Sequence, residues 1–480
     1  MSDILLFNPP APGGRGYTRE GRCTQEAGVW GTQWPPLTLA TAAALLRRDG
    51  HRVTLRDYPA TGLDLLSLTE DLRTLRPDFV IWSTGTPTFS SDLDIARVVR
   101  ENAPKSVTAV IGTHVTVRPE EALCEPALSI VVRGEPEGII RKICQCDGMW
   151  ADVPGISWRD NDGAIHRNPD ASLLEPDAIP APDWDGLDQD AYRLPLKGRR
   201  FLMVAPVRGC PFRCTFCTAP LYYGYRLRRR PVAQVVDEMA AGVSRYGIRE
   251  FFVWADTFTA DRSYVRDLCR AVLERGLRIS WTCNSRVDTI DEETLRLMKQ
   301  AGLWMISFGL ESGNDAILAA SGKGITAAQS REAVEMANRL GIRTAGHFMF
   351  GLPGEKEETM AETLALALSL PLDIAQFYAA APFPGTALYD NVLREGWLKE
   401  AERGGTAPDF RQPPPRPFSQ NVAIMELPGL PAARVDAFRR YAYRRFYLRP
   451  RAARRVLSMV EPGALAGMAP ILRRFLRWLR

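Results

Sequence analysis

The sequence predicts an α/β protein with an N-terminal doubly wound parallel sheet, a partial (β/α)6 TIM-type barrel and a helical, arginine-rich C-terminal region. Short apolar segments alternate with amphipathic ones over residues 1–147 and again over 199–396. Between them, residues 148–198 carry six prolines and little periodicity, which is typical of a linker. Residues 397–480 complete a chain whose length suits two or three domains.

The first region alternates strands with helices. Apolar runs predict its strands, and segments with one apolar face predict its helices. Strands separated by helices of this length pair in parallel, and an open parallel sheet binds its ligand beyond the strand C-termini, where the strand order reverses. We expect strands over 4–8, 51–57, 79–83, 107–112 and 130–132, and helices over 37–48, 64–75 and 92–102.

The same alternation resumes after the linker. Six βα repeats predict a partial barrel, whose chemistry gathers at the C-terminal ends of its strands. We expect strands over 201–206, 250–255, 279–284, 305–309, 344–350 and 374–379, and helices over 232–246, 263–275, 291–301, 327–340 and 359–370.

The composition indicates a soluble globular protein, with 45% hydrophobic and 24% charged residues. No basic stretch followed by an apolar run stands at the N-terminus, and no segment approaches the ~18 apolar residues of a membrane span. Nine cysteines without such a signal do not form a disulfide framework. They indicate a reducing, cytoplasmic compartment.

Three cysteines follow the first predicted barrel strand. Cys210, Cys214 and Cys217 have a C-x3-C-x2-C spacing. Three thiolates can bind three irons of a [4Fe–4S] cluster and leave the fourth iron open to a ligand. Structural zinc is the alternative, but it needs a fourth ligand nearby, and the next cysteines, Cys269 and Cys283, lie on an expected helix and strand. The spacing therefore favours a cluster bound by these three cysteines, which are also the candidate catalytic residues.

This motif, with the aromatic Phe216 before its last cysteine, resembles the radical S-adenosylmethionine (SAM) superfamily. Residues 252–259, 284–286, 307–312 and 347–355 resemble the motifs on later barrel strands of that superfamily. The resemblance implies that the reduced cluster cleaves SAM to a 5′-deoxyadenosyl radical, and it makes Phe216 an expected cofactor contact. It also implies an external one-electron reductant, a flavodoxin or a ferredoxin.

Charged residues at successive strand ends are the candidate SAM contacts. SAM is a zwitterion that also carries a sulfonium, so its site needs groups of both signs. Asp256 and Glu311 suit the ammonium and the ribose hydroxyls, and Arg286 suits the carboxylate. Each alone could be a surface charge, but their common register favours a site. The resemblance adds Ser312 and Gly351, the latter in an adenine-binding motif.

The loops after the predicted strands of the first region are rich in glycine, serine and threonine, so backbone and hydroxyl donors can approach a large polar ligand. The G-x-G-x-x-G motif that a dinucleotide would require is absent after the first strand. The order and spacing of these loops resemble the Rossmann-like cobalamin-binding domain directly upstream of one class of radical SAM enzymes. The resemblance implies cobalamin contacts at Asn8, Ser83, Thr84, Gly112, Thr113, His114, Gly134 and Glu135.

The axial ligation of cobalt follows from a missing motif. The Asp-x-His-x-x-Gly signature, whose histidine binds cobalt in methionine-synthase-like domains, is absent after the first strand. We therefore expect cobalamin to bind without a protein histidine on cobalt. His114 is the one histidine on a predicted cofactor loop, and we expect it to pack against the corrin or to bond to the backbone. A degenerate sheet without a cofactor is the alternative.

The C-terminal tail is strongly basic. Residues 431–480 contain thirteen arginines against two acidic residues, whereas the whole chain has a net charge of +5. Residues 469–480 place Phe475 and Trp478 beside four of these arginines, a pattern typical of a helix at a membrane interface. Docking on the barrel is the equal alternative. No nucleic-acid-binding module accompanies the charge, which disfavours nucleic acid as a partner.

The resemblance implies C-methylation of an unactivated carbon in a small-molecule or lipid intermediate, because cobalamin can deliver a methyl group to a carbon radical. The alternative is an oxidative cyclase or rearrangement enzyme, similar to the anaerobic Mg-protoporphyrin ester cyclase or the hopanoid-tailoring enzymes. A tRNA methylthiotransferase would need three further clustered cysteines, but Cys23, Cys124, Cys144 and Cys146 are scattered. We expect a cytoplasmic enzyme, with peripheral contact to the inner face of the membrane left open.

Overall fold

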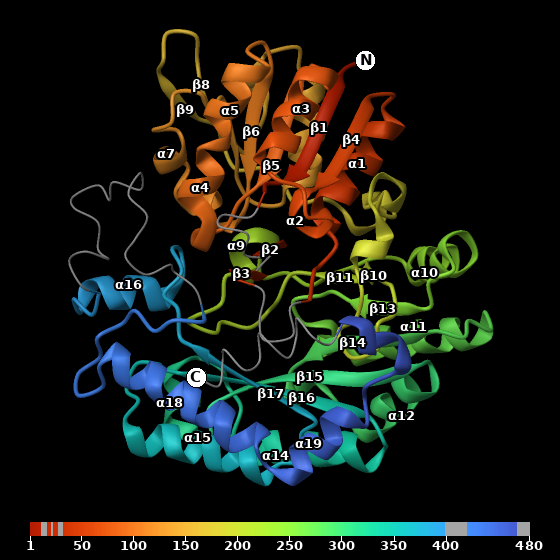
Figure 1. Cartoon of the computed structure of the whole chain (residues 1–480), viewed down its shortest axis with the longest axis vertical. Helices are drawn as coiled ribbons and strands as arrows, with labels where there is room; N and C mark the ends of the chain where they lie inside the picture. The colour runs from red at the N-terminus through yellow and green to blue at the C-terminus, as the bar shows by residue number, and fades with distance from the viewer. Residues whose placement is uncertain (11–16, 21–22, 27–31, 399–419, 468–480) are drawn as a thin grey trace.

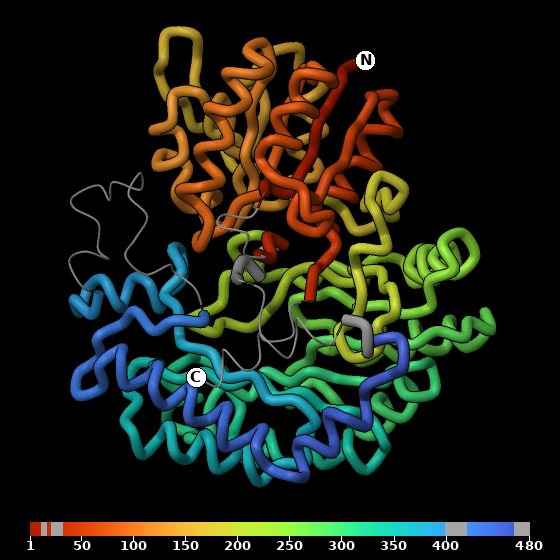
Figure 2. The backbone as a smooth tube through the Cα atoms, in the orientation of Figure 1, coloured from red at the N-terminus to blue at the C-terminus, as the bar shows by residue number. Residues whose placement is uncertain are grey.

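The structure is a computed structural model that describes residues 1–10, 17–20, 23–26, 32–398 and 420–467. Figure 1 shows two α/β bodies, a first body in red to orange and a half-barrel in green to blue. Figure 2 shows the yellow connecting segment that descends from the first body to the first barrel strand. Two separate sheets, as the sequence predicts, are therefore confirmed.

Five parallel strands form most of the first body. They are β1 (Asp3–Asn8), β4 (Arg52–Asp57), β5 (Phe79–Ser83), β6 (Val107–Ile111) and β7 (Ile130–Val132). Their spatial order is β4-β1-β5-β6-β7. The order reverses between β1 and β5, so the switch point where such sheets bind ligands lies beyond Asn8 and Ser83.

Helices cover both faces of this sheet. They are α1 (Leu37–Arg48) and α8 (Pro136–Gln145) on one face, and α3 (Leu65–Leu75) and α5 (Ile95–Asn102) on the other. Successive strand residues point to opposite faces, so Leu6 joins the core with α1 and Phe7 joins the core with α3. The helix expected over 92–102 is divided, because α4 (Phe89–Leu93) ends before α5 begins.

The predicted linker contains two strands, which is a difference from the sequence-based prediction. β8 (Ile156–Arg159) pairs antiparallel with β7, and β9 (Ile165–Arg167) pairs with β8. The turn between them is held by Asp160, whose Oδ1 accepts hydrogen bonds from the backbone N–H of Asp162 at 3.0 Å and of Ala164 at 2.8 Å. The sheet therefore has seven strands and extends past residue 147.

The half-barrel has the six parallel strands that the sequence predicts, in sequential order. They are β10 (Phe201–Val204), β13 (Glu250–Val253), β14 (Ser280–Ser285), β15 (Leu303–Glu311), β16 (Arg343–Phe350) and β17 (Ile374–Ala379). The helices between them are α10 (Val232–Tyr246), α11 (Arg262–Glu274), α12 (Glu292–Gln300), α14 (Ala327–Arg339) and α15 (Glu357–Ser369). Each strand therefore delivers its C-terminal end to the same edge, which faces the first body (Figure 1).

Smaller elements lie between the two bodies. A hairpin of β2 (Tyr17–Glu20) and β3 (Cys23–Glu26) stands in the loop after β1, where no strand is predicted from the sequence. Arg19 of this hairpin donates to Asp92 of α4 at 2.7 and 2.9 Å, and both side chains are buried. The pair fixes the hairpin on the first body.

Two helices after the barrel pack against it. They are α18 (Ala432–Tyr447) and α19 (Pro450–Leu457), and α18 lies along β17 and α15. Tyr447 Oη donates to the carbonyl of Ala375 at 2.8 Å, and Tyr443 Oη accepts from the N–H of Phe377 at 3.1 Å. The aromatic side chains of α18 therefore serve barrel packing.

The basic segment over 469–480 lies outside the described residues. In the part of the chain that the structure describes, no helix combines the length and apolarity that crossing a membrane requires.

Candidate active site

The three-cysteine loop is fixed by a short antiparallel pair at its base. β11 (Val207–Arg208) pairs with β12 (Arg228–Arg229), so the loop leaves and re-enters at one place. Gly209 begins the loop at φ +86°, and a Cβ there would stand 2.2 Å from the carbonyl oxygen of Arg226. Only glycine fits this close approach. Because residue 209 is a glycine, the cysteine loop can fold tightly over the ends of the barrel strands.

The thiols of the loop lie beside cationic and hydroxyl groups. Cys210 Sγ is 2.9 Å from Thr257 Oγ1, and Cys214 Sγ is 3.8 Å from Nη1 of Arg286. Burial raises the pKa of Cys214, while the nearby Lys323 and Arg286 act in the opposite direction. The two cations therefore offset part of the burial that disfavours the thiolate of Cys214, which is the form that binds iron.

The cysteines fit a cluster better than a single ion. Within the described ranges, no group of three His, Cys, Asp or Glu side chains is arranged to hold one metal ion. A cubane cluster binds each cysteine to a different iron, so its ligands lie farther apart than those of one ion. Cys214 and Cys217 are half-buried, and Cys217 lines a cavity. The donor set therefore suits a [4Fe–4S] cluster, which Cys210, Cys214 and Cys217 would hold beside that cavity.

The cavity beside the loop has a volume of about 220 Å³ and carries groups of both charges. It brings together most of the SAM-site residues predicted from the sequence. These are Phe216, Cys217, Asp256, Arg286 and Glu311. They come from the loop and from the ends of three successive strands, so the predicted register is present. A zwitterionic ligand can find a partner here for each of its charges.

Each charged residue of the cavity already has a partner. Asp256 Oδ2 accepts from the N–H of Gly209 at 3.2 Å, which ties the second strand end to the cysteine loop. Arg286 donates to both oxygens of Asp288 at 2.9 and 2.8 Å, and its guanidinium lies 3.6 Å from the ring centre of Phe212. These bonds hold the side chains in place.

Lys323 also lines the cavity and was not predicted from the sequence. Its Nζ lies 2.7 Å from Oε1 of Glu311, and both side chains are buried. Glu311 itself has φ +58°, a conformation that costs energy for a residue with a side chain and that clusters at functional sites. In the sequence, the signal that could have indicated this residue is its place between two glycines, Gly322 and Gly324, in the loop before α14. Both glycines have positive φ in the structure.

Two predicted SAM contacts, Ser312 and Gly351, do not line this cavity. The Ser312 hydroxyl lies 3.1 Å from Thr363 Oγ1 and accepts from the N–H of Asn314, away from the cavity lining. Gly351 donates its N–H to Oε2 of Glu355 at 2.5 Å. Glu355 is buried, which raises its pKa to about 8. Glu355 therefore shapes the turn after β16. The SAM contacts expected at Ser312 and Gly351 stay predictions.

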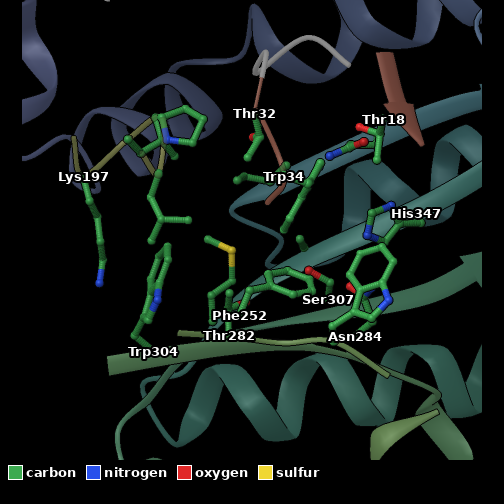
Figure 3. Close-up of a pocket in the computed structure, with 18 of the residues that line it drawn as sticks. Thr18, Thr32, Trp34, Lys197, Phe252, Thr282, Asn284, Trp304, Ser307 and His347 are labelled. Carbon is green, nitrogen blue, oxygen red and sulfur yellow. The ribbon is translucent and has the colours of Figure 1, made fainter. Parts of the chain in front are cut away.

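A second chamber, drawn in Figure 3, shares part of its lining with the first. It also has a volume of about 220 Å³ and lies on the inner face of the half-barrel. Both spaces share the side chains of Asn284, Ser307, His347 and Tyr378, so they meet at this wall. Trp34 of the first body covers the chamber from the opposite side. The site therefore has two connected compartments.

The predicted cobalamin loops converge at the switch point of the first sheet. Asn8 accepts a hydrogen bond from the Ser83 hydroxyl, and Thr84 Oγ1 donates to Asp92 at 2.9 Å. At Gly112, with φ +144°, a Cβ would stand 2.2 Å from the carbonyl oxygen of Thr84. The loops after β1, β5 and β6 are thus close together, with backbone and hydroxyl groups at their tips. Asn8, Ser83 and Thr84 are buried, and cobalamin contacts at these loops stay predictions.

His114 and the adjacent Thr113 are buried on α6 (Thr113–Val117). His114 Nδ1 lies 3.2 Å from Thr86 Oγ1, and its Nε2 lies 3.4 Å from Oε2 of Glu121. Its ring centre is 4.2 Å from that of Phe89. Both ring nitrogens face groups of the same body.

Glu135, whose contact with cobalamin stays a prediction, lies between the first body and the base of the cysteine loop. Its Oε1 accepts from Arg208 at 2.5 Å, and its Oε2 accepts from Arg228 at 2.9 Å and from the N–H of Leu174 at 3.0 Å. Because both oxygens bind the cysteine-loop base and the connecting segment, the carboxylate joins the two bodies. Gly134 beside it has φ +80° and open space where a Cβ would stand.

Comparisons with known proteins agree with this geometry. The model of the radical SAM superfamily matches residues 204–367, and that of the B12 binding domain matches residues 27–143. An uncharacterized methyltransferase of Pyrococcus horikoshii is 33% identical to this chain, over 88% of it and 90% of the relative. A cytidylyl-2-hydroxyethylphosphonate methyltransferase of Streptomyces wedmorensis is 30% identical over 83% of both chains.

Two further proteins extend the similarity. The anaerobic magnesium-protoporphyrin IX monomethyl ester cyclase of Cereibacter sphaeroides is 29% identical over 75% of this chain and 60% of the cyclase. The solved structure of the radical SAM methyltransferase TsrM from Kitasatospora setae superposes with a TM-score of 0.71 at 17% identity, over 96% of this chain and 90% of TsrM. The chain belongs to the family of radical SAM enzymes that carry an N-terminal B12-binding domain, whose members include both methyltransferases and cyclases.

Proposed function

We propose that this protein transfers a methyl group from SAM, by way of cobalamin, to an unactivated carbon of a small-molecule or lipid intermediate. One observation carries the proposal. A charged cavity beside the three-cysteine loop joins a chamber that has Lys197 as the one charged residue among its described lining residues and that the B12-binding domain covers through Trp34. SAM, substrate and cobalamin can therefore approach one another within two connected compartments.

The residues of the charged cavity have distinct roles in this proposal. Cys210, Cys214 and Cys217 bind the cluster, and Arg286 with Lys323 supplies positive charge for the SAM carboxylate. When bound, the reduced cluster supplies the electron that cleaves SAM to a 5′-deoxyadenosyl radical, and cobalamin carries the methyl group. The protein's own contribution is to orient SAM and to exclude water from the radical.

The alternative is an oxidative cyclisation or rearrangement at the same site. The cyclase of Cereibacter sphaeroides shares 29% identity, close to the 33% and 30% of the two methyltransferases. The methyltransferases match over a larger share of their own length, at 90% and 83% against 60% for the cyclase. That difference supports methylation as the first candidate.

The experiment uses full-length protein reconstituted anaerobically with iron, sulfide and hydroxocobalamin, and SAM labelled with deuterium in its methyl group. It is incubated with a metabolite extract from a host strain that lacks the gene. A methyltransferase produces 5′-deoxyadenosine, S-adenosylhomocysteine and an extract compound heavier by the labelled methyl. A cyclase produces 5′-deoxyadenosine without label transfer.

Matched variants separate the cluster from general damage. Cys214→Ala should abolish 5′-deoxyadenosine formation, while Cys124→Ala, at an exposed cysteine outside the loop, should retain it. Formation of 5′-deoxyadenosine by protein in which all three loop cysteines are alanine would show that the cluster assignment is wrong.

We further propose two partners. The cluster requires an external one-electron reductant, a flavodoxin or a ferredoxin. The basic segment over 469–480 supports contact with anionic lipid on the inner face of the membrane, since each basic residue near such a surface adds about 1 kcal/mol. Co-sedimentation of the full-length and 1–468 proteins with phosphatidylglycerol vesicles tests the second proposal. Equal pelleting of both proteins would contradict it.

A further inference from the structure

We infer that the second chamber of the barrel binds a substrate whose enclosed part is uncharged and largely apolar. The inference rests on the proposed function, because it names the class of molecule that this active site modifies. Its basis is the separation of charged from uncharged residues between the two compartments.

The cavity beside the cysteine loop is lined by charged side chains of both signs. Asp256, Arg286, Glu311 and Lys323 line it. Among the described residues that line the second chamber, there is no Asp, Glu or Arg, and Lys197 is the one lysine. A charged substrate group placed in this chamber would lose its hydration and find no free counter-ion, which costs far more than burying an apolar group.

Lys197 is already neutralised. Its Nζ donates to both oxygens of Glu250 at 2.9 Å and to Ser280 Oγ at 2.9 Å, which satisfies the three donors of the ammonium. Arg199 also reaches Glu250, at 3.4 Å, and pairs with Glu461 at 2.6 Å. Two cations thus balance two carboxylates. An anionic substrate would have to break this network and leave Glu250 buried without its nearest partner.

Aromatic side chains from both bodies form one wall of the chamber. The ring centre of Trp34 lies 4.5 Å from that of Phe252 and 5.9 Å from that of Trp254. Figure 3 shows Trp34 above the strands that carry Phe252 and Thr282. Met305 on β15 and Ile374 on β17 add apolar surface. Such a wall gains free energy from contact with rings or branched hydrocarbon.

Hydrogen-bonding groups gather where the chamber meets the SAM cavity. His347 Nδ1 lies 3.2 Å from Tyr378 Oη, which donates to Gln376. Asn284 stands on the same shared wall. A hydroxyl, carbonyl or amide of the substrate can bond here. This end holds the substrate's polar group and the adjacent carbon nearest to SAM, while the apolar part extends toward Trp34 and Met305.

The test measures equilibrium binding to the full-length, cluster-loaded protein by calorimetry, without turnover. Four probes are used, the neutral indole and geraniol and their charged counterparts indole-3-acetate and geranyl phosphate. We expect at least one neutral probe to bind, and its charged counterpart to bind at least about ten-fold more weakly. The ring or chain that binds better identifies the apolar part. Stronger binding of the charged counterparts, or binding of neither neutral probe, would overturn the inference.

Matched variants place that binding in the chamber. Ala345→Phe fills the chamber from β16 and should weaken the neutral probe at least about ten-fold, whereas Ala328→Phe on the exposed side of α14 should not. If Ala345→Phe does not fold, Trp34→Ala removes the opposite wall and should weaken the probe in the same direction. Unchanged binding in the folded variants would overturn the inference. Because 5′-deoxyadenosine formation is measured separately, failure of the proposed radical chemistry is distinguishable from failure here.

Discussion

The guanidinium of Arg208 lies 2.5 Å from Oε1 of Glu135, and this buried contact joins the base of the cysteine loop to the first body. Arg208 also donates to Glu137 at 2.7 Å, while Arg228 donates to the second oxygen of Glu135 at 2.9 Å. All four side chains are no more than 4% exposed. Arg208 is two residues from Cys210, so the network relates the cluster loop directly to the domain that faces it.

Breaking this network should destabilise the protein strongly. Arg208→Met leaves Glu135 and Glu137 buried with only one arginine, and removal of one partner of a buried ion pair costs about 3–5 kcal/mol. Calorimetric unfolding should show a clearly lower midpoint temperature. Arg296→Met, which removes an exposed pair with Glu292 on α12, should change stability by no more than about 0.5 kcal/mol. Equal effects of both variants would contradict the structural role of the network.

Lys323 should contribute to SAM affinity. Lys323→Gln removes the cation beside Glu311, and a hydrogen bond to a charged group contributes about 1.5–3 kcal/mol, so binding of SAM should weaken roughly ten- to hundred-fold. Calorimetric titration with SAM measures the change. Lys299→Gln, an exposed lysine at the end of α12, is the control and should leave the affinity unchanged. If Lys323→Gln binds SAM as tightly as the wild type does, Lys323 does not contribute to the SAM site.

Much of the fold follows from periodicity. The strand over 374–379 and the helix over 232–246 agree with the structure at both ends, because long apolar patterns are bounded there by clear changes in polarity. The hairpin of β2 and β3 was missed, since its polar residues show no core-facing pattern. Its stability comes from distant partners instead, such as Asp92 for Arg19 and Thr38 for Glu20.

The residues of the candidate site also divide into those that a sequence pattern predicts and those that it does not. Asp256, Arg286 and Glu311 are predictable because they follow apolar strands in one register, so their side chains meet at one edge. Lys323 lies in a loop, where no period relates a side chain to the strand ends. Glu135 was assigned to cobalamin because its segment matches a family pattern. Its partner Arg208 is 73 residues away, and no local signal relates the two.

Glu355 should make stability depend on pH. Burial raises its pKa from 4.5 to about 8, so the folded state binds a proton that the unfolded state releases. The stability from this group is complete below about pH 4.5 and is lost as the pH rises toward 8, at roughly 1.4 kcal/mol per unit. Glu355→Gln keeps an acceptor for Gly351 and Leu352. Urea unfolding at pH 5 and pH 8.5 should therefore show a smaller loss of stability in the variant than in the wild type.

His114 should not bind cobalt. Its Nδ1 faces Thr86 and its Nε2 faces Glu121, so both ring nitrogens are directed to groups of the first body. Protein loaded with cobalamin and reduced to Co(II) should give an electron paramagnetic resonance spectrum without splitting from an axial nitrogen, and His114→Ala should not change it. Nitrogen splitting that disappears in His114→Ala would show that this histidine is the axial ligand.

Gly112 should be required for the cobalamin surface. With φ +144° and a Cβ position 2.2 Å from the Thr84 carbonyl, Gly112→Ala must separate the loops after β5 and β6. Gly163→Ala, in the β8–β9 turn, is the matched control, because it also places alanine at positive φ (+87°) but meets no atom within 4 Å. Both variants lose about 1–3 kcal/mol from backbone strain. Only Gly112→Ala should also weaken binding of hydroxocobalamin, followed by its visible absorbance on titration into the folded protein. If the two glycine variants bind hydroxocobalamin equally well, the contact of Gly112 with Thr84 supports the sheet alone and the ligand surface lies elsewhere.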